Sequence, residues 1–134
     1  MRLVLDCNVI VSAAWNPGIA RTVLLYGVRH HEIVVSATIL AEYRRVAGYA
    51  KLARIRSTLD GLIDLVEAVA LLVEGGPVDH QLPDPTDVIY LAAAHDGDAA
   101  IVITGNVKDF PDRQYGPVRV LTVREFATAA GILV

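Results

Sequence analysis

Five oxygen-bearing side chains fall at positions where a folded chain can bring them together: Asp6, Glu42, Asp87, Asn106 and Asp109. Carboxylates confined in a small cleft raise one another's pKa, because each negative charge opposes the ionisation of the next. A divalent cation relieves this repulsion, and hard oxygen ligands of this kind suit Mg²⁺ or Mn²⁺. One or two such ions activate a water and stabilise the charge that develops on a phosphodiester. The residue types therefore indicate metal-assisted phosphodiester hydrolysis.

Three of these side chains follow apolar segments that the sequence predicts to be buried strands. Asp6 comes directly after segment 2–5, and both Asn106 and Asp109 lie just beyond segment 100–104. In open parallel sheets, ligands bind outside the carboxyl ends of the strands. We therefore expect these three side chains at one edge of a sheet.

The other two side chains lie on predicted helices. Asp87 is in the first turn of a helix that leads into the strand at 100–104, and Glu42 is about two turns into the helix after the second strand. Each acid alone has a plainer interpretation: Asp6 and Asp109 as turn residues, Asp87 as a helix cap and Glu42 as a solvated residue. Only their combination predicts a metal site.

The elements that must position these residues alternate between strand and helix. Ser36 and Thr122 are expected to cap helices, Gly27 to end one and Gly131 to follow the last. The strands are apolar without polar alternation, which indicates a sheet covered on both faces. We expect an α/β fold, a three-layer α/β/α sandwich with a short, mainly parallel central sheet. Strands are predicted at 2–5, 33–35, 100–104 and 118–121, and helices after Asp6 and at 19–26, 37–47, 57–69, 87–95 and 123–130.

Composition restricts the class of protein. The chain has 134 residues, 54% of them hydrophobic and 20% charged, which favours a single folded domain over residues 1–134. One cysteine, Cys7, excludes an internal disulfide and a multi-cysteine zinc site. No stretch approaches the ~18 apolar residues typical of a membrane span, and the start lacks the pattern of a signal peptide. We therefore expect a cytoplasmic protein that is not bound to a membrane.

The net charge of −3 argues against nucleic-acid binding through overall charge, but basic residues gather between positions 44 and 56. Arg44 and Arg45 could contact an RNA backbone, and a solvated face or a salt bridge is an equal alternative. For Trp15 we favour packing in the core over stacking on a base. We expect Cys7 to be a buried, unreactive thiol.

Four segments together resemble the motifs of the PIN-domain family, in family order and over almost the whole chain. Residues 3–13 resemble the opening motif, a hydrophobic strand that runs into Asp-x-Asn-Val, and residues 35–43 resemble the second, a helix that carries a glutamate. Residues 84–94 resemble the third, an aspartate that opens an alanine-rich helix. Residues 103–111 resemble the fourth, a strand that ends in Thr-Gly-Asn/Asp and is followed by Asp-Phe.

The resemblance implies that Asp6, Glu42 and Asp87 are catalytic residues that line a Mg²⁺ or Mn²⁺ site. The family's fourth acidic position lies around the Thr-Gly-Asn segment, where this chain has Asn106. Either Asn106 contributes its carbonyl oxygen or Asp109 supplies the fourth, catalytic carboxylate, and the sequence leaves both open. Thr104 is expected to contribute a hydroxyl around the metal ligands, and Asn8 is expected to position Asp6.

The resemblance also implies a function, that of the VapC-like toxin ribonucleases. Such toxins of type II toxin–antitoxin pairs cut RNA endonucleolytically, are held inactive by a cognate antitoxin and often form homodimers. Two alternatives keep the fold: a non-catalytic RNA- or protein-binding module, which the asparagine at 106 favours, and a nuclease of RNA maturation or decay without an antitoxin. A haloacid-dehalogenase-type phosphatase and a receiver domain fit poorly, because residue 8 is Asn and Asp6 has no acidic neighbour.

Overall fold

The computed structural model describes residues 1–132, in which six strands form one sheet in the order β3-β2-β1-β4-β6-β5. All neighbouring strands are parallel except β5 and β6, which form an antiparallel pair at one edge. The strands are β1 (Arg2–Leu5), β2 (Glu32–Ser36), β3 (Leu71–Val73), β4 (Ile101–Thr104), β5 (Gln114–Tyr115) and β6 (Val118–Thr122).

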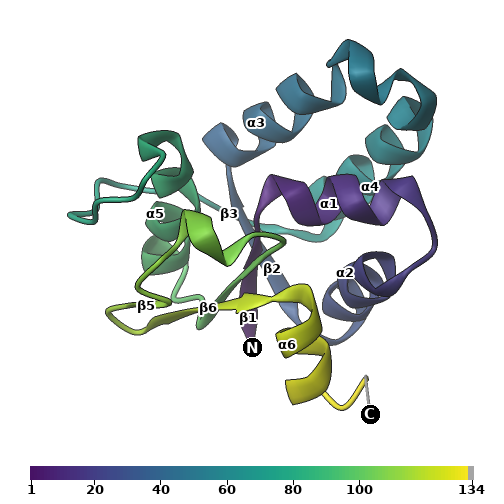
Figure 1. The fold of residues 1–134 in the computed structure, drawn as a ribbon. Coiled ribbons are helices and arrows are strands. Elements are labelled where there is room, and N and C mark those ends of the chain that lie inside the picture. The colour runs from purple at the N-terminus through teal and green to yellow at the C-terminus, as the bar shows by residue number, and fades with distance from the viewer. Residues whose placement is uncertain (133–134) are drawn as a thin grey trace.

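Helices cover both faces of the sheet, which confirms the three-layer α/β/α architecture (Figure 1). α1, α2, α4 and α6 gather on one side, and α5 covers the other, where it contacts β1, β2, β4 and β6. The helices are α1 (Cys7–Trp15), α2 (Ile19–His30), α3 (Ala37–Ala47), α4 (Arg56–Val69), α5 (Val88–Asp96) and α6 (Val123–Ala129), with short 3₁₀ helices η1 (Ala50–Ile55), η2 (Pro85–Asp87) and η3 (Val107–Asp109).

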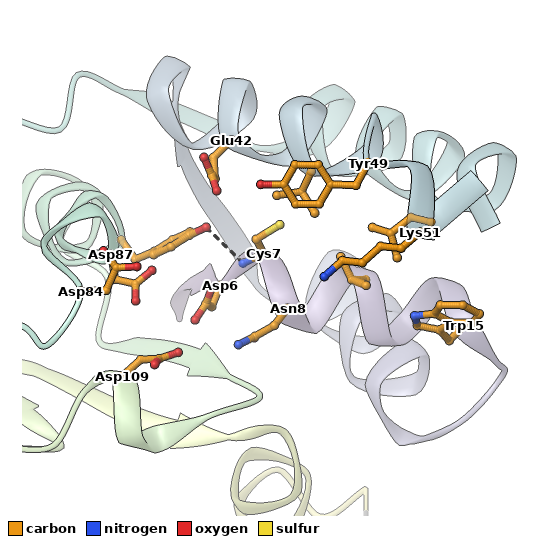
Figure 2. A pocket seen from close by; sticks show the side chains of 14 residues that line it. Asp6, Cys7, Asn8, Trp15, Glu42, Tyr49, Lys51, Asp84, Asp87 and Asp109 are labelled. Atoms are coloured by element: carbon orange, nitrogen blue, oxygen red, sulfur yellow. Dashed lines mark hydrogen bonds between the residues drawn. The ribbon is translucent and has the colours of Figure 1, made fainter. Parts of the chain in front are cut away.

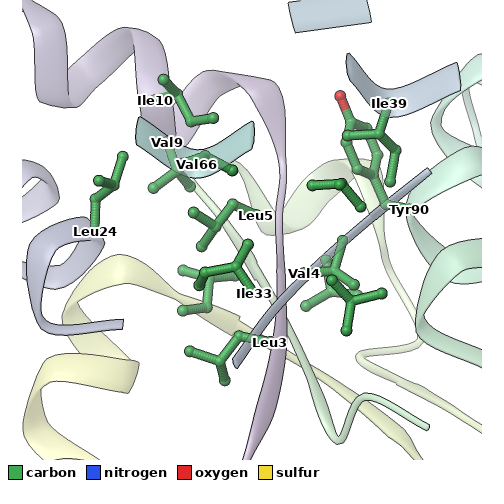
Figure 3. Packing of buried hydrophobic residues seen from close by; sticks show 14 of the residues in the cluster. Leu3, Val4, Leu5, Val9, Ile10, Leu24, Ile33, Ile39, Val66 and Tyr90 are labelled. Atoms are coloured by element: carbon green, nitrogen blue, oxygen red, sulfur yellow. The ribbon is translucent and has the colours of Figure 1, made fainter. Parts of the chain in front are cut away.

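The central strand β1 is buried on both faces. Successive side chains of a strand point to opposite faces, so Leu3 and Leu5 pack toward α1 and α2, whereas Val4 packs toward Tyr90 of α5 (Figure 3). All four of these side chains are at most 2% exposed. This two-sided burial explains why the strand sequence lacks polar alternation. The first polar residue, Asp6, comes directly after the strand ends at Leu5.

The predicted caps are confirmed. The Ser36 hydroxyl accepts a hydrogen bond from the Ile39 amide at 3.1 Å, and Thr122 forms a capping box with Glu125. Gly131 follows α6 with φ +75°, the left-handed conformation that glycine adopts without strain.

The prediction that Gly27 ends the second helix is wrong, because α2 continues to His30. Gly27 is buried inside the helix, where an added Cβ would stand 3.3 Å from the Ile33 side chain and 3.4 Å from that of Leu3. The glycine therefore allows α2 to lie close against β1 and β2. Strands β3 and β5 were also not predicted, since each has at most three residues and β3 follows α4 without a turn signal.

The order of strands creates a switch point beside β1. The chain passes from β1 to β2 and β3 on one side and returns to β4 on the other side of β1. Ligands of open α/β sheets bind at such a point, outside the carboxyl ends of the two central strands. In this chain those ends are Leu5 and Thr104. Within residues 1–132, no helix combines the length and the apolar character needed to cross a membrane.

Candidate metal centre

Asp6 lies at the carboxyl end of β1, at the switch point. Its amide donates to the Ile103 carbonyl at 2.9 Å, and its carboxylate accepts a hydrogen bond from the Thr104 hydroxyl at 2.9 Å. Both side chains are buried, and burial raises the pKa of Asp6 to about 6 despite this hydrogen bond. Thr104 thus fixes the orientation of the Asp6 carboxylate.

Asp87 and Asp109 line the same cavity as Asp6 (Figure 2). Asp87 ends η2 directly before α5, and Asp109 ends η3 beyond β4, so three separate elements bring the three carboxylates together. Burial, followed by the negative charges of Asp6 and Asp109, raises the pKa of Asp87 to about 7. The carboxylates are therefore close enough to oppose one another's ionisation.

Asp84 is a further carboxylate of this cavity, which the sequence did not indicate as a site residue. It caps η2, since it accepts hydrogen bonds from the Thr86 amide at 3.0 Å and the Thr86 hydroxyl at 2.8 Å. These bonds lower the pKa of Asp84. Its position three residues before Asp87 in the same motif is the signal that marks it as part of the site.

Glu42 also faces the cavity, from α3, but its carboxylate is paired with Arg45. The Arg45 guanidinium reaches both Glu42 oxygens, with distances of 2.6 Å and 3.0 Å, and also hydrogen-bonds the Tyr49 hydroxyl. The ion pair raises the pKa of Arg45. Arg45 thus neutralises one of the acids at the edge of the cavity.

Arg44, the neighbouring residue, is directed away from the cavity. Its guanidinium contacts Asp64 at 2.6 Å and Glu67 at 3.1 Å on α4, and Asp60 at 3.7 Å. Both arginines therefore form the salt bridges that the sequence left as one alternative. The predicted RNA contacts of Arg44 and Arg45 stay predictions.

The side chains of Asn8 and Asn106 both hold the loop after β4. The Asn8 side chain accepts a hydrogen bond from the Gly105 amide at 2.8 Å, and an added Cβ on Gly105 would stand 3.2 Å from the same oxygen. The Asn8 side chain thus supports the loop, while the Asn8 backbone hydrogen-bonds the Asp6 carboxylate and opposes the rise of its pKa. The Asn106 side-chain oxygen accepts from the Lys108 amide at 3.2 Å and caps η3. Of the two candidates for the fourth acidic position, Asp109 is the one that lines the cavity.

The donor set fits a hard divalent cation. Carboxylates from four elements face one cavity, and the raised pKa values of Asp6 and Asp87 reflect burial and repulsion that a cation would offset. In the part of the chain that the structure describes, however, no three Asp, Glu, His or Cys side chains are arranged to hold one ion as they stand. An ion held by three or more of these side chains would therefore require them to rotate, and Glu42 would have to leave Arg45 to be a ligand.

The cavity extends well beyond the acids and has a volume of about 590 Å³. Its other end is lined by Trp15, Tyr49 and Lys51 (Figure 2). The expectation that Trp15 packs in the core is wrong, because its side chain is 46% exposed where α1 ends. Between the two ends lies Cys7, which is half-buried at the cavity wall rather than buried as predicted. Burial and nearby acids raise the pKa of its thiol to about 12, which favours the unreactive, protonated form.

Comparisons with known proteins agree with this fold. The family model of the PIN domain matches residues 2–108, and no curated protein matches the sequence. The solved structure of VapBC2 from Rickettsia felis, bound to a DNA fragment from its promoter, is similar with a TM-score of 0.61 at 15% identity, over 91% of this chain and 98% of that chain. DNA-bound VapBC from Salmonella typhimurium is similar with a TM-score of 0.61 at 16% identity, over 92% of this chain and 98% of that chain.

We expect Arg45→Ala to tighten Mg²⁺ binding by a factor of about two to five, because the variant frees Glu42 and removes a cation from an exposed ion pair at the cavity. Isothermal titration calorimetry measures the affinity. Arg44→Ala is the matched control, since it removes an ion-paired arginine of the same helix outside the cavity, and its affinity should equal that of the wild type. Weaker binding by Arg45→Ala alone would contradict the competition.

We expect Asp87→Asn to stabilise the metal-free protein at pH 8 by about 1 kcal/mol, a figure reduced for solvent screening. The folded protein has the pKa of Asp87 raised from 3.8 to about 7, so it favours the neutral carboxyl and loses stability as the pH rises through this range. Urea unfolding in EDTA measures this effect, and the gain should shrink at pH 4.5. Asp98→Asn, at an exposed position with φ 51° that Asn tolerates, should change little. A less stable Asp87→Asn at pH 8 would argue against repulsion among the acids.

Proposed function

Since this chain belongs to the PIN-domain family, we propose that it is a metal-dependent endoribonuclease and the toxin of a type II toxin–antitoxin pair. The observation that carries the nuclease is the group of carboxylates at the switch point, above all Asp6 and Asp87 with pKa values raised to about 6 and about 7. Acids that repel one another in this way are suited to a cation and unsuited to a purely structural role.

Asp6, Asp87 and Asp109 would hold Mg²⁺ or Mn²⁺, with Glu42 joining after release from Arg45. The ion, when bound, activates a water and offsets negative charge on the phosphodiester. Asp84 lies at the same cavity and is suited to orienting the ion's waters. The hydrolysis would break one phosphorus–oxygen bond of the RNA and consume one water.

The chain's own residues supply orientation and charge. The Thr104 hydroxyl holds one Asp6 oxygen and leaves the other free to face the cavity, while the bond between Asn8 and Gly105 holds the loop that leads to Asp109. Without a cation, the raised pKa values keep a share of protons on Asp6 and Asp87 near neutral pH. Ion binding is therefore expected to release protons and to strengthen as the pH rises.

A non-catalytic RNA- or protein-binding module does not account for this group of acids. A module that only binds RNA or protein gains nothing from five carboxylates in one cavity, because they repel the phosphate backbone and disfavour the folded state. A nuclease of RNA maturation or decay uses the same site as a toxin, so only the partner distinguishes the two.

We expect purified protein to cut single-stranded RNA internally in Mg²⁺ or Mn²⁺ and not in EDTA. Asp6→Asn should lower the cleavage rate by about 100-fold or more, since it removes a ligand charge and keeps the side chain's shape. The measurement is gel analysis of labelled RNA after incubation. Asp98→Asn, an exposed acid outside the cavity, should cleave as the wild type does. Equal cleavage by wild type and Asp6→Asn would exclude the proposed site.

The toxin role and its partners form a separate proposal. The motifs resemble those of toxins that an antitoxin holds inactive, and the two solved structures described above are of VapBC. We expect a short reading frame beside this gene to encode a protein that copurifies with the chain and suppresses its RNA cleavage. An active nuclease that forms no such complex would instead favour RNA maturation or decay. A homodimer, measurable by light scattering, and a cytoplasmic location stay predictions.

A further inference from the structure

The end of the cavity opposite the carboxylates has a different chemistry. Trp15 ends α1, Tyr49 directly precedes η1, and Lys51 lies in η1, so two segments distant in sequence place two aromatic side chains and a cation together (Figure 2). Leu52 of η1 is 4% exposed and belongs to the hydrophobic core, so it anchors this segment. The cavity thus has an acidic end and an aromatic, basic end.

Trp15 is unusual because its large apolar surface is left in contact with the solvent. Its side chain is 46% exposed, although the adjoining turn of α1 buries Ala13 and Ala14 at 0% and 4%. A tryptophan that served only the core would be covered, since its burial is among the largest contributions that one side chain makes. Its exposed face at the cavity wall is therefore available to a planar ligand.

Lys51 adds a cation that is not already paired. Within residues 1–132 it takes part in no ion pair, and its ammonium lies 5.8 Å from the centre of the Tyr49 ring. Arg45 also lies over this ring, at 5.4 Å, but its charge is committed to Glu42. Of these two cations, Lys51 is the one free to bind an anion.

We propose that this end of the cavity is the subsite for the nucleotide next to the cleaved phosphate, with its base stacked on Trp15 and its phosphate on Lys51. The inference rests on the proposed nuclease function and describes how the cavity beside the acids holds the RNA. An RNA whose scissile phosphate lies at the acids must continue along the surface, and this end belongs to the same cavity. Aromatic faces and a cation are the two features by which proteins bind single-stranded nucleic acid.

The subsite has consequences for the substrate. A base can stack on Trp15 only after it has left its own helix, so the protein should bind single strands and loops in preference to duplexes. Stacking tolerates every base because each has a flat face, so this subsite orients the strand more than it selects a sequence.

The test uses the fact that Trp15 is the only tryptophan of the chain. We expect a single-stranded RNA octamer to quench the tryptophan fluorescence of the Asp6→Asn variant in Mg²⁺, and a duplex of the same sequence to quench it much less. Asp6→Asn limits cleavage during the titration and lowers the negative charge that would repel the RNA. No saturable quenching would overturn the proposal.

Affinity measurements in the Asp6→Asn background isolate the two contacts. Trp15→Ala should weaken octamer binding by about fivefold to 150-fold, and Trp15→Phe should restore most of it. Lys51→Ala should also weaken binding and reduce by about 1 the slope of the logarithm of the affinity against the logarithm of the salt concentration. The matched control is Arg54→Ala. Arg54 is a cation of the same 3₁₀ helix, but its side chain does not line the cavity.

A series of octamers, each lacking the base at one position, tests whether a base stacks on Trp15. One abasic position should weaken binding to the tryptophan form and have little further effect on Trp15→Ala, because both changes remove the same contact. Equal losses in both forms would overturn the stacking assignment. So would a Trp15→Ala variant that binds RNA normally and loses only a protein partner.

These outcomes separate the subsite from the nuclease. Quenching and a Trp15-dependent affinity without any cleavage by the wild type would support the subsite and contradict the nuclease. Metal-dependent cleavage that is unchanged in Trp15→Ala and Lys51→Ala would support the nuclease and overturn the subsite.

Discussion

The parallel pairing of β1 with β4 is the constraint on which the candidate site depends. Its register sets Leu5 beside Ile103, so the next residues of the two strands, Asp6 and Thr104, meet at the carboxyl edge and form a buried hydrogen bond. Because the strand order reverses beside β1, no crossover helix covers this edge. The sheet therefore leaves a polar opening in an otherwise apolar core.

The same arrangement has an electrostatic cost. Asp6 is only 5% exposed and lies near Asp109, so burial and then like charge disfavour its ionised form. A fold that retained these acids for stability alone would be more stable with neutral side chains in their place. The cost is understandable if a cation binds there, because the cation then converts repulsion into attraction.

α3 and η1 connect the acidic centre to the rest of the cavity. Along α3, Glu42 and Arg45 lie on the side of the cavity, whereas Arg44, one residue away, is held by the acids of α4. The chain then continues through Tyr49 into η1, which carries Lys51 to the far end. Glu42, neutralised by Arg45, and the unpaired cation of Lys51 thus lie along the same wall of the cavity.

The sequence by itself determined the strands β1, β2, β4 and β6, the caps Ser36 and Thr122, and four of the five acids that line the cavity. Hydrophobic periodicity, capping and motif order are local properties of a chain. The sequence predicted neither the short strands β3 and β5 nor the continuation of α2 through Gly27, which depend on neighbours far away in sequence. Only the tertiary structure decided that Trp15 faces the cavity, that Asp84 joins the acids and that Asn8 holds Gly105. Those outcomes depend on which surfaces meet when the helices pack on the sheet, and no short segment contains that information.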